Sequence, residues 1–210
     1  MGLKERRQRE KEERKSLILK AAKGLLLKRG ITGTSMNQIA AEAELGVATL
    51  YSYFKNKEEL FLIIQKEGQE LLYEKCLKAS KNITDPREKL RRYAATYLDF
   101  SVENRNYYCI INHFISSPEM LFSPGMKSES DERAARNLEL NEKAIIEGIE
   151  QGLFQEVEIK RCALIFWGII HSTIQFKKFE MTLLKNDDYS EFFNYSVERF
   201  IQMLMVPGNE

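Results

Sequence analysis

Apolar residues recur at spacings of three and four along most of this chain, which is the pattern of amphipathic α-helices. The first such stripe begins at Ser16 and ends where two basic residues, Lys28 and Arg29, precede Gly30. Basic residues in a last turn followed by glycine are typical of a helix C-terminus. The stripe therefore predicts a first helix, built on Leu17, Ile18, Ala21, Ala22, Leu25 and Leu26.

Two shorter apolar segments follow the first helix. In the first of them four apolar residues share one face, and two hydroxyl residues stand before it with oxygens able to cap its free N–H groups. In the second, Leu50 and Phe54 are four residues apart, and a break at residues 44–46 separates the two segments. The pattern predicts a helix-turn-helix at about residues 35–54, a motif whose second helix lies in the major groove of DNA. The apolar face of the first segment consists of Met36, Ile39, Ala40 and Ala43.

The rest of the chain also carries helical patterns, so we predict an all-α fold of about nine helices. Residues 58–82 form one long stripe, Pro86 opens the next, and two prolines and a glycine predict a long loop at residues 116–127. The last two helices, within residues 158–184 and 188–205, are apolar on more than one face. Such helices suggest a homodimer that forms through a four-helix bundle. The predicted dimer interface consists of Phe166, Ile170, Ile174, Phe193, Phe200, Ile201 and Leu204.

Charge is distributed unevenly along the chain. Residues 1–57 contain 13 Lys and Arg against 6 Asp and Glu, a balance of +7, whereas residues 58–210 have a balance of −6. A basic N-terminal part on an acidic body is typical of a protein that binds a polyanion. The alternative for residues 4–15 alone is a solvated charged tail, either helical or mobile, and the neighbouring helix-turn-helix favours a basic arm that contacts DNA.

The segment around the helix-turn-helix resembles the N-terminal domain of the TetR (tetracycline-repressor-like) family of bacterial transcriptional regulators. The resemblance covers about Ser16 to Glu67 and rests on Thr49, Leu50, Tyr51, Tyr53, Phe54, Lys57 and Leu60. It implies a DNA-binding domain over residues 1–57 and an effector-binding and dimerisation domain over residues 58–210. Two positions depart from the family pattern: Glu44 stands where a turn glycine is usual, and Gly46 stands where a capping serine is usual.

The candidate DNA contacts combine chemistry with matched position. Hydroxyls, phenols and an ammonium suit phosphate oxygens, the amide of Asn37 can reach a base edge, and the start of the second helix usually touches bases. For the two tyrosines the alternative is packing beneath the recognition helix. The predicted contacts are Thr34, Ser35, Asn37, Gly46, Val47, Ala48, Thr49, Tyr51, Tyr53 and Lys57.

The resemblance also implies a pocket for a small hydrophobic effector in the C-terminal body. Aromatic residues and the two histidines supply an apolar wall with a few polar groups, although each of them also suits plain core packing. The predicted pocket residues are Tyr93, Tyr97, Phe100, Tyr107, His113, Phe114, Trp167 and His171.

Other classes of function find little support in the sequence. His113 and His171 are far apart and lie in no metal-spaced cluster, and no phosphate loop or nucleophile motif occurs, so we expect no enzyme activity, cofactor or metal site. The three cysteines are widely spaced, which suggests reduced thiols in the cytoplasm. The N-terminus lacks the apolar core of a signal peptide, and no long apolar run predicts a membrane span.

The leading hypothesis is therefore a homodimeric repressor that binds a palindromic double-stranded DNA operator and leaves it when a small effector binds. Two alternatives remain open at this point. The protein could be a DNA-binding regulator that needs no ligand, or a helical interaction module whose basic part binds a protein.

Overall fold

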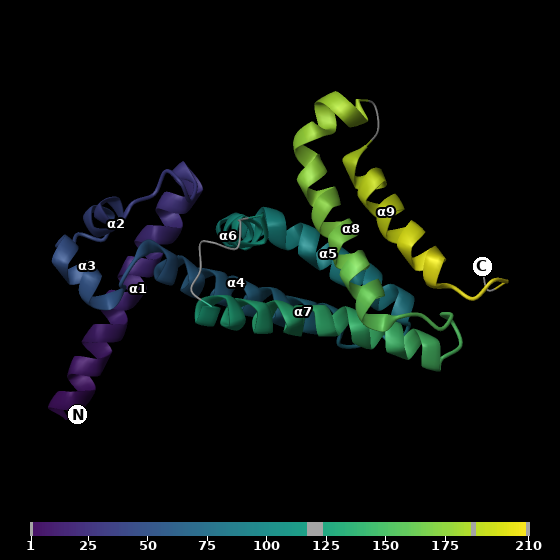
Figure 1. Ribbon diagram of the computed structural model, residues 1–210, viewed down its shortest axis with the longest axis horizontal. Helices are drawn as coiled ribbons and strands as arrows, with labels where there is room; N and C mark the ends of the chain where they lie inside the picture. The colour runs from purple at the N-terminus through teal and green to yellow at the C-terminus, as the bar shows by residue number, and fades with distance from the viewer. Residues whose placement is uncertain (1, 117–123, 186–187, 209–210) are drawn as a thin grey trace. The chain divides into compact units, whose positions relative to one another are not determined.

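A computed structural model describes residues 2–116, 124–185 and 188–208, and these residues are almost wholly helical (Figure 1). In this part of the chain the only pairing of β type is an isolated bridge between Phe154 and Met205. The all-α prediction is confirmed. The helices are α1 (Leu3–Arg29), α2 (Met36–Glu42), α3 (Val47–Tyr53), α4 (Lys57–Ser80), α5 (Pro86–Glu103), α6 (Arg105–Ser116), α7 (Pro124–Glu150), α8 (Ile159–Phe176) and α9 (Tyr189–Leu204), with short 3₁₀ and π turns at Lys177–Phe179 and Glu180–Leu184.

The structure decides between the two predicted states of the N-terminal arm, because α1 begins at Leu3 and continues without a break to Arg29. It ends as predicted at Gly30, whose φ of 69° favours glycine. The loop predicted at residues 116–127 is shorter than expected. Its last part is helical, since Pro124 opens α7, and residues 117–123 lie outside the described residues. Proline suits this first helical position because its missing N–H has no partner there.

The chain forms two compact units that do not correspond to a single cut in the sequence. The first unit comprises Met1–Gln69 and Asn104–Asp131, and the second comprises Glu70–Glu103 and Glu132–Glu210. Helix α6 therefore packs with the helix-turn-helix, although nearly the whole of α4 and α5 separates them in sequence. The predicted functional assignment of residues 1–57 and 58–210 remains a prediction.

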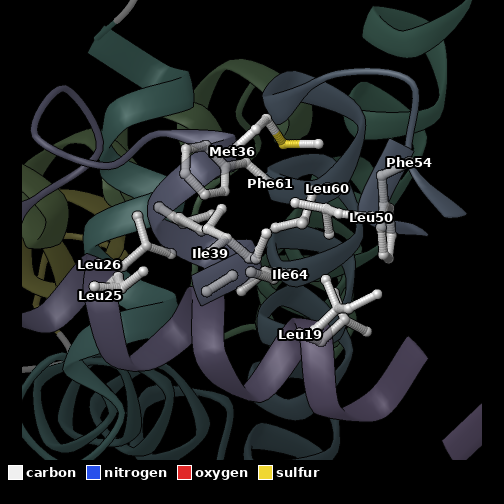
Figure 2. Packing of buried hydrophobic residues seen from close by; sticks show 14 residues of the cluster. Leu19, Leu25, Leu26, Met36, Ile39, Leu50, Phe54, Leu60, Phe61 and Ile64 are labelled. Atoms are coloured by element: carbon white, nitrogen blue, oxygen red, sulfur yellow. The ribbon is translucent and has the colours of Figure 1, made fainter. Parts of the chain in front are cut away.

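The core of the first unit joins α1, α2, α3, α4 and α6 (Figure 2). Leu50 and Phe54 of the second short segment are 0% and 1% exposed, and they pack with Leu19 and Leu60 on the neighbouring helices. Ile110 of α6 belongs to the same cluster. The helix-turn-helix is too short to hold its shape alone, so this shared core fixes the angle between its two helices.

The second unit contradicts the predicted dimer interface. Its seven residues, on α8 and α9, are all at most 7% exposed within the single chain. The rings of Phe166 and Phe200, for example, lie 4.8 Å apart and pack α8 directly against α9. The sequence pattern correctly predicted that these apolar residues are buried. The residues that cover them belong to the same chain and not to a second subunit. The corrected residues are Phe166, Ile170, Ile174, Phe193, Phe200, Ile201 and Leu204.

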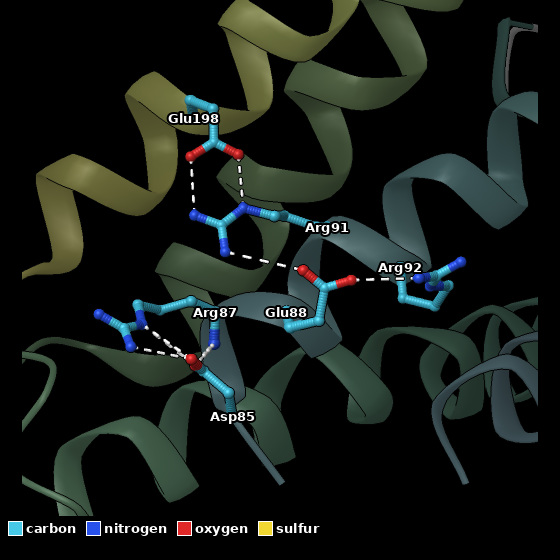
Figure 3. Close-up of polar contacts among 6 residues, drawn as sticks. All are labelled: Asp85, Arg87, Glu88, Arg91, Arg92 and Glu198. Atoms are coloured by element: carbon cyan, nitrogen blue, oxygen red, sulfur yellow. Dashed lines mark hydrogen bonds and ion pairs between the residues drawn. The ribbon is translucent and has the colours of Figure 1, made fainter. Parts of the chain in front are cut away.

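A network of ion pairs connects α5 with α9 in this unit (Figure 3). Arg91 donates from Nε to Oε1 of Glu198 at 2.6 Å and from Nη2 to Oε2 at 2.9 Å, so the pair is bidentate. The hydrogen bonds from Arg91 lower the pKa of the Glu198 carboxyl, against the opposing effect of partial burial. Glu88 lies between Arg91 and Arg92 and is paired with both. Together these pairs fix the rotation of α5 against α9.

Candidate nucleic-acid interface

The first helix of the helix-turn-helix begins with a reciprocal cap at Ser35, which is one of the two hydroxyl residues, Thr34 and Ser35, that the sequence offered as caps. The Ser35 hydroxyl oxygen accepts the backbone N–H of Gln38 at 3.3 Å, and the Ser35 N–H donates to the Gln38 side-chain oxygen at 2.9 Å. This is a capping box, and it satisfies two of the free N–H groups at the start of α2. Ser35 and Asn37 are both exposed, so they remain available at the surface of the unit.

The turn after α2 is closed by two backbone hydrogen bonds. The N–H of Leu45 donates to the carbonyl of Ala40 at 2.9 Å, and the N–H of Glu44 donates to that of Ala41 at 3.1 Å. This is the pattern of a Schellman motif, which places the residue after the C-cap in the left-handed region. That residue is Glu44, with a φ of 55°. The displaced glycine noted in the sequence therefore has a structural cost, because Glu44 occupies the one position of the turn where glycine is favoured.

Replacing Glu44 by glycine is expected to raise the free energy of unfolding by about 1 kcal/mol, since it removes the strain of a side chain at positive φ. Urea unfolding followed by circular dichroism would measure the change. Glu44→Ala is the matched control, because it removes the charge but keeps the Cβ atom in the same conformation. A gain in Glu44→Ala equal to that of Glu44→Gly would show that charge, and not backbone conformation, is responsible.

The second helix, α3, divides sharply into a buried and an exposed side. Leu50 is completely buried, whereas Val47 is 39% and Tyr51 50% exposed, and Ala48 is also exposed. Gly46 is the N-cap and provides no side-chain hydrogen bond, so the first N–H groups of α3 have no side-chain cap. Free N–H groups at a helix N-terminus can bind phosphate oxygens. The exposed side of α3 thus offers methyl groups, one phenol and backbone donors.

Three of the predicted contacts have other roles within the unit. Thr34 is 2% exposed and its hydroxyl donates to the carbonyl of Gly30 at 2.7 Å. The predicted phosphate contact by this side chain is therefore wrong, and its role is structural. Tyr53 is half-buried and packs against the core, in line with the packing alternative. The ammonium of Lys57 donates to the carbonyl of Ile31 at 3.3 Å and lies 5.8 Å from the ring centre of Phe61. Thr49 is half-buried as well.

Two exposed polar residues beside α3 were missed by the sequence argument. Ser52 lies one residue after Tyr51, and its hydroxyl donates to the carbonyl of Thr49 at 2.6 Å. Lys55 follows the end of α3 and presents an exposed side chain next to the recognition helix. The signal for Lys55 was its place in the connection between the short α3 and the long α4, where a basic residue rarely has a packing role.

A polar cluster fixes α1 to α4 and α6 on another side of the same unit. Lys23 donates to Oε2 of Glu67 at 2.5 Å and contacts the hydroxyl of Tyr107 at 2.9 Å, and that hydroxyl donates to Glu67 at 3.1 Å. Burial alone lowers the pKa of Lys23, but the hydrogen bonds with Glu67 and Tyr107 outweigh it, so the pKa is raised. The charged side chain of Lys23 therefore connects α1 with α4 and α6. One predicted pocket residue, Tyr107, has a structural role here.

The eight predicted pocket residues are distributed over both units. Tyr107, His113 and Phe114 lie on α6 in the first unit, and Tyr107 and Phe114 pack against its core. The other five lie in the second unit, where Tyr93, Tyr97 and Phe100 are buried and Trp167 and His171 half-buried. A cavity of about 340 Å³ in this unit is lined instead by other residues of α5 and α9, half of them charged, including Arg91 and Glu198.

Three of the predicted pocket residues in the second unit, Tyr97, Trp167 and His171, lie in contact with one another. The Tyr97 hydroxyl and Nδ1 of His171 share a hydrogen bond of 2.8 Å, and the rings of Trp167 and His171 stack at 5.1 Å. Burial lowers the pKa of His171, so the imidazole is neutral near pH 7. A neutral imidazole between two aromatic rings is compatible both with an apolar core and with the wall of a ligand site.

The family model of bacterial regulatory proteins of the tetR family matches residues 18–64, which span the C-terminal part of α1, all of α2 and α3 and the start of α4. Residues 18–64 of this chain therefore match the tetR family. The match contains every residue of the shared core around the helix-turn-helix except Ile110 of α6.

Two curated TetR-family relatives resemble this chain over part of its length. The transcriptional activator FasR of Mycolicibacterium smegmatis is 28% identical over 112 residues, 52% of this chain and 51% of that protein. The transcriptional repressor NicS of Pseudomonas putida is 30% identical over 94 residues, 45% of this chain and 44% of that protein. The chain thus spans about half the length of these relatives.

A solved structure resembles the chain over nearly its whole length. AibR in complex with isovaleryl coenzyme A and operator DNA is 25% identical, has a TM-score of 0.66, and covers 91% of this chain and 98% of its own. None of the described helices is long and apolar enough to cross a membrane.

Proposed function

We propose that this protein is a transcriptional regulator of the TetR family that binds double-stranded DNA through α3. The observation that carries the proposal is the division of α3 into a buried side, with Leu50 in the shared core, and an exposed side with Val47, Ala48 and Tyr51. The core holds α3 rigidly on its buried side, and the exposed side carries small and apolar side chains. Such a helix suits the major groove, where methyl groups can contact thymine. The basic balance of residues 1–57 adds attraction to phosphates.

Regulators with a helix-turn-helix commonly bind as dimers, and an apolar surface on α8 and α9 supports a homodimer here. On α8, Ile165 is 50% and Phe176 43% exposed, and Gly168, where an added Cβ would meet open space, lies between them. On α9, Tyr195 is 60% and Met203 49% exposed. A small residue such as Gly168, flanked by apolar residues, allows two helices to approach closely. We therefore propose this exposed surface as the dimer interface, in place of the seven buried residues predicted from the sequence.

Replacing Ile165 by glutamate is expected to convert the dimer to a monomer at micromolar concentration, because it places a charge in an apolar interface. Analytical ultracentrifugation would measure the change. Val102→Glu is the matched control, since Val102 is 60% exposed on α5 of the same unit. Equal dissociation of both variants, or of neither, would contradict this interface.

An aromatic group on α5 and α8 suggests the chemical class of the effector. A small hydrophobic molecule fits the group of Tyr97, Trp167 and His171, which offers aromatic surface and a neutral imidazole. AibR, the structural neighbour, was solved with an acyl coenzyme A together with operator DNA. Release from DNA requires that the effector bind the DNA-free conformation more tightly than the DNA-bound one. We therefore propose a repressor that responds to such a ligand.

The test begins with selection of duplexes from a random-sequence library, followed by footprinting of the selected DNA. Protection of one palindrome with two half-sites about one helical turn apart is expected from a dimer that uses two copies of α3. Diffuse protection at all sequences would favour an architectural protein, and salt-insensitive binding or none would refute DNA binding. Release of the DNA by isovaleryl coenzyme A or a related acyl coenzyme A would support the repressor. An operator that no such ligand releases would favour the ligand-independent regulator.

A further inference from the structure

The N-terminal extension of α1 is a helix that no other described element covers. Residues 4–14 are all exposed, and Figure 1 shows this end of α1 extending beyond α2 and α3 of the same unit. An isolated helix of this length is marginal in water. The extension is stabilised by continuity with the packed half of α1 and by ion pairs along its surface.

The glutamates of this extension lie on one side of the helix, together with two of its basic residues. The acidic side is internally paired: Arg6 with Glu10 at 2.9 Å, and Arg9 with Glu13 at 3.0 Å. Four other basic residues recur at spacings of three and four and so lie within a sector of about 100°, with no carboxylate among them. They form no ion pair within the described residues. We call this set the basic stripe: Lys4, Arg7, Lys11 and Arg14.

The basic stripe continues the face of α1 that packs against the helix-turn-helix. The same helical spacing leads from Arg14 to Ile18, Ala22 and Leu25, which are at most 4% exposed and belong to the core of the first unit. The stripe therefore lies on the side of α1 where α2 packs, displaced toward the N-terminus. The paired residues Arg6 and Arg9 lie on the opposite side.

We infer that the basic stripe binds the phosphates of one DNA strand beside the major groove that α3 enters. The inference rests on the proposed function and adds a second contact region to it. The stripe spans about 15 Å, and phosphates advance about 3.4 Å along the axis per nucleotide, so each of its charges can reach a separate phosphate. Four unpaired charges facing the same side as the helix-turn-helix suit a polyanion better than a mixed protein surface. This contact carries no sequence information and adds affinity to every site.

The test compares two double variants of equal charge change on the same extension. Arg7→Gln with Lys11→Gln removes two charges of the stripe, and Arg6→Gln with Arg9→Gln removes two charges from the paired side. Both are titrated against the selected duplex and against a mixed-sequence duplex at several salt concentrations. The stripe variant is expected to bind both duplexes at least about ten-fold more weakly near physiological salt, with a salt slope shallower by about 2 to 4. The control is expected to stay within about two-fold, because screening at this salt confines charge effects to about 8 Å.

A charge-preserving variant separates binding from helix stability. Arg7→Lys with Lys11→Arg keeps the stripe and is expected to bind like the wild type, while circular dichroism monitors the helix content of all variants. Equal affinities and equal salt slopes for the stripe variant and its control would overturn the inference and leave the proposed function intact. Failure of the wild-type protein to bind either duplex would instead overturn the proposed function, and the inference with it.

Discussion

Replacing Phe54 by alanine is expected to lower the free energy of unfolding by about 3–5 kcal/mol, because it leaves a cavity in the core that joins the helix-turn-helix to α4. Phe54 is 1% exposed and packs beside Leu50 at the end of α3 (Figure 2). The midpoint of thermal unfolding should fall by roughly 10 °C. Circular dichroism during heating and urea titration would both measure the loss. DNA binding should fail at temperatures where the variant is partly unfolded and recover on cooling.

Tyr51→Ala provides the matched control, since it removes a ring of similar size from the same helix. Tyr51 is 50% exposed, so its loss should change stability by no more than about 1 kcal/mol while still weakening DNA binding several-fold. A Phe54→Ala variant as stable as Tyr51→Ala would show that the core does not depend on α3. Unchanged DNA affinity in Tyr51→Ala would remove the phenol from the proposed contacts.

Replacing Ala48 by glutamate is expected to weaken DNA binding by at least about 100-fold without unfolding the protein. Ala48 is exposed in the first turn of α3, where residues usually approach base edges, and a carboxylate there would be repelled by phosphates and left without hydration in the groove. A gel-shift or fluorescence-anisotropy titration with the selected duplex would measure the effect. Glutamate near a helix N-terminus favours the helix itself, so stability should be unchanged or slightly higher.

Ala48→Gln separates charge from size in this experiment. Glutamine has nearly the same shape as glutamate and is expected to lose much less affinity, since it can form hydrogen bonds with bases or water. Equal losses in the two variants would indicate a steric block alone. Full affinity in both would place the recognition surface on another part of the first unit.

The sequence was most informative where local rules determine the structure. The end of α1 at Gly30, the cap at Ser35 and the inward positions of Leu50 and Phe54 follow from spacing and residue chemistry, and the structure confirms them. The strained turn was also visible as a displaced glycine at Glu44. Such features depend on neighbours within about five residues, so no knowledge of tertiary packing is needed.

The errors concern partners that are distant in sequence. An apolar residue such as Ile201 shows that a helix is buried on that side, but its pattern is the same whether the covering helix belongs to the same chain or to another. Tyr107 was assigned to a ligand pocket because it is aromatic, and it proved to be hydrogen-bonded to Lys23 and Glu67. Thr34 matched a contact position, yet its hydroxyl closes the turn after α1.

The discontinuous first unit has a consequence for the order in which the protein folds. Ile110 of α6 is completely buried in the core that supports α3, and it is synthesised 57 residues after Tyr53, where the recognition helix ends. During synthesis, a ribosome must release α4, α5 and α6 before that core can close. The DNA-binding surface therefore reaches its final structure only when the middle of the chain has left the ribosome. In nascent chains that end before α6, the core of the helix-turn-helix lacks the residues that α6 contributes.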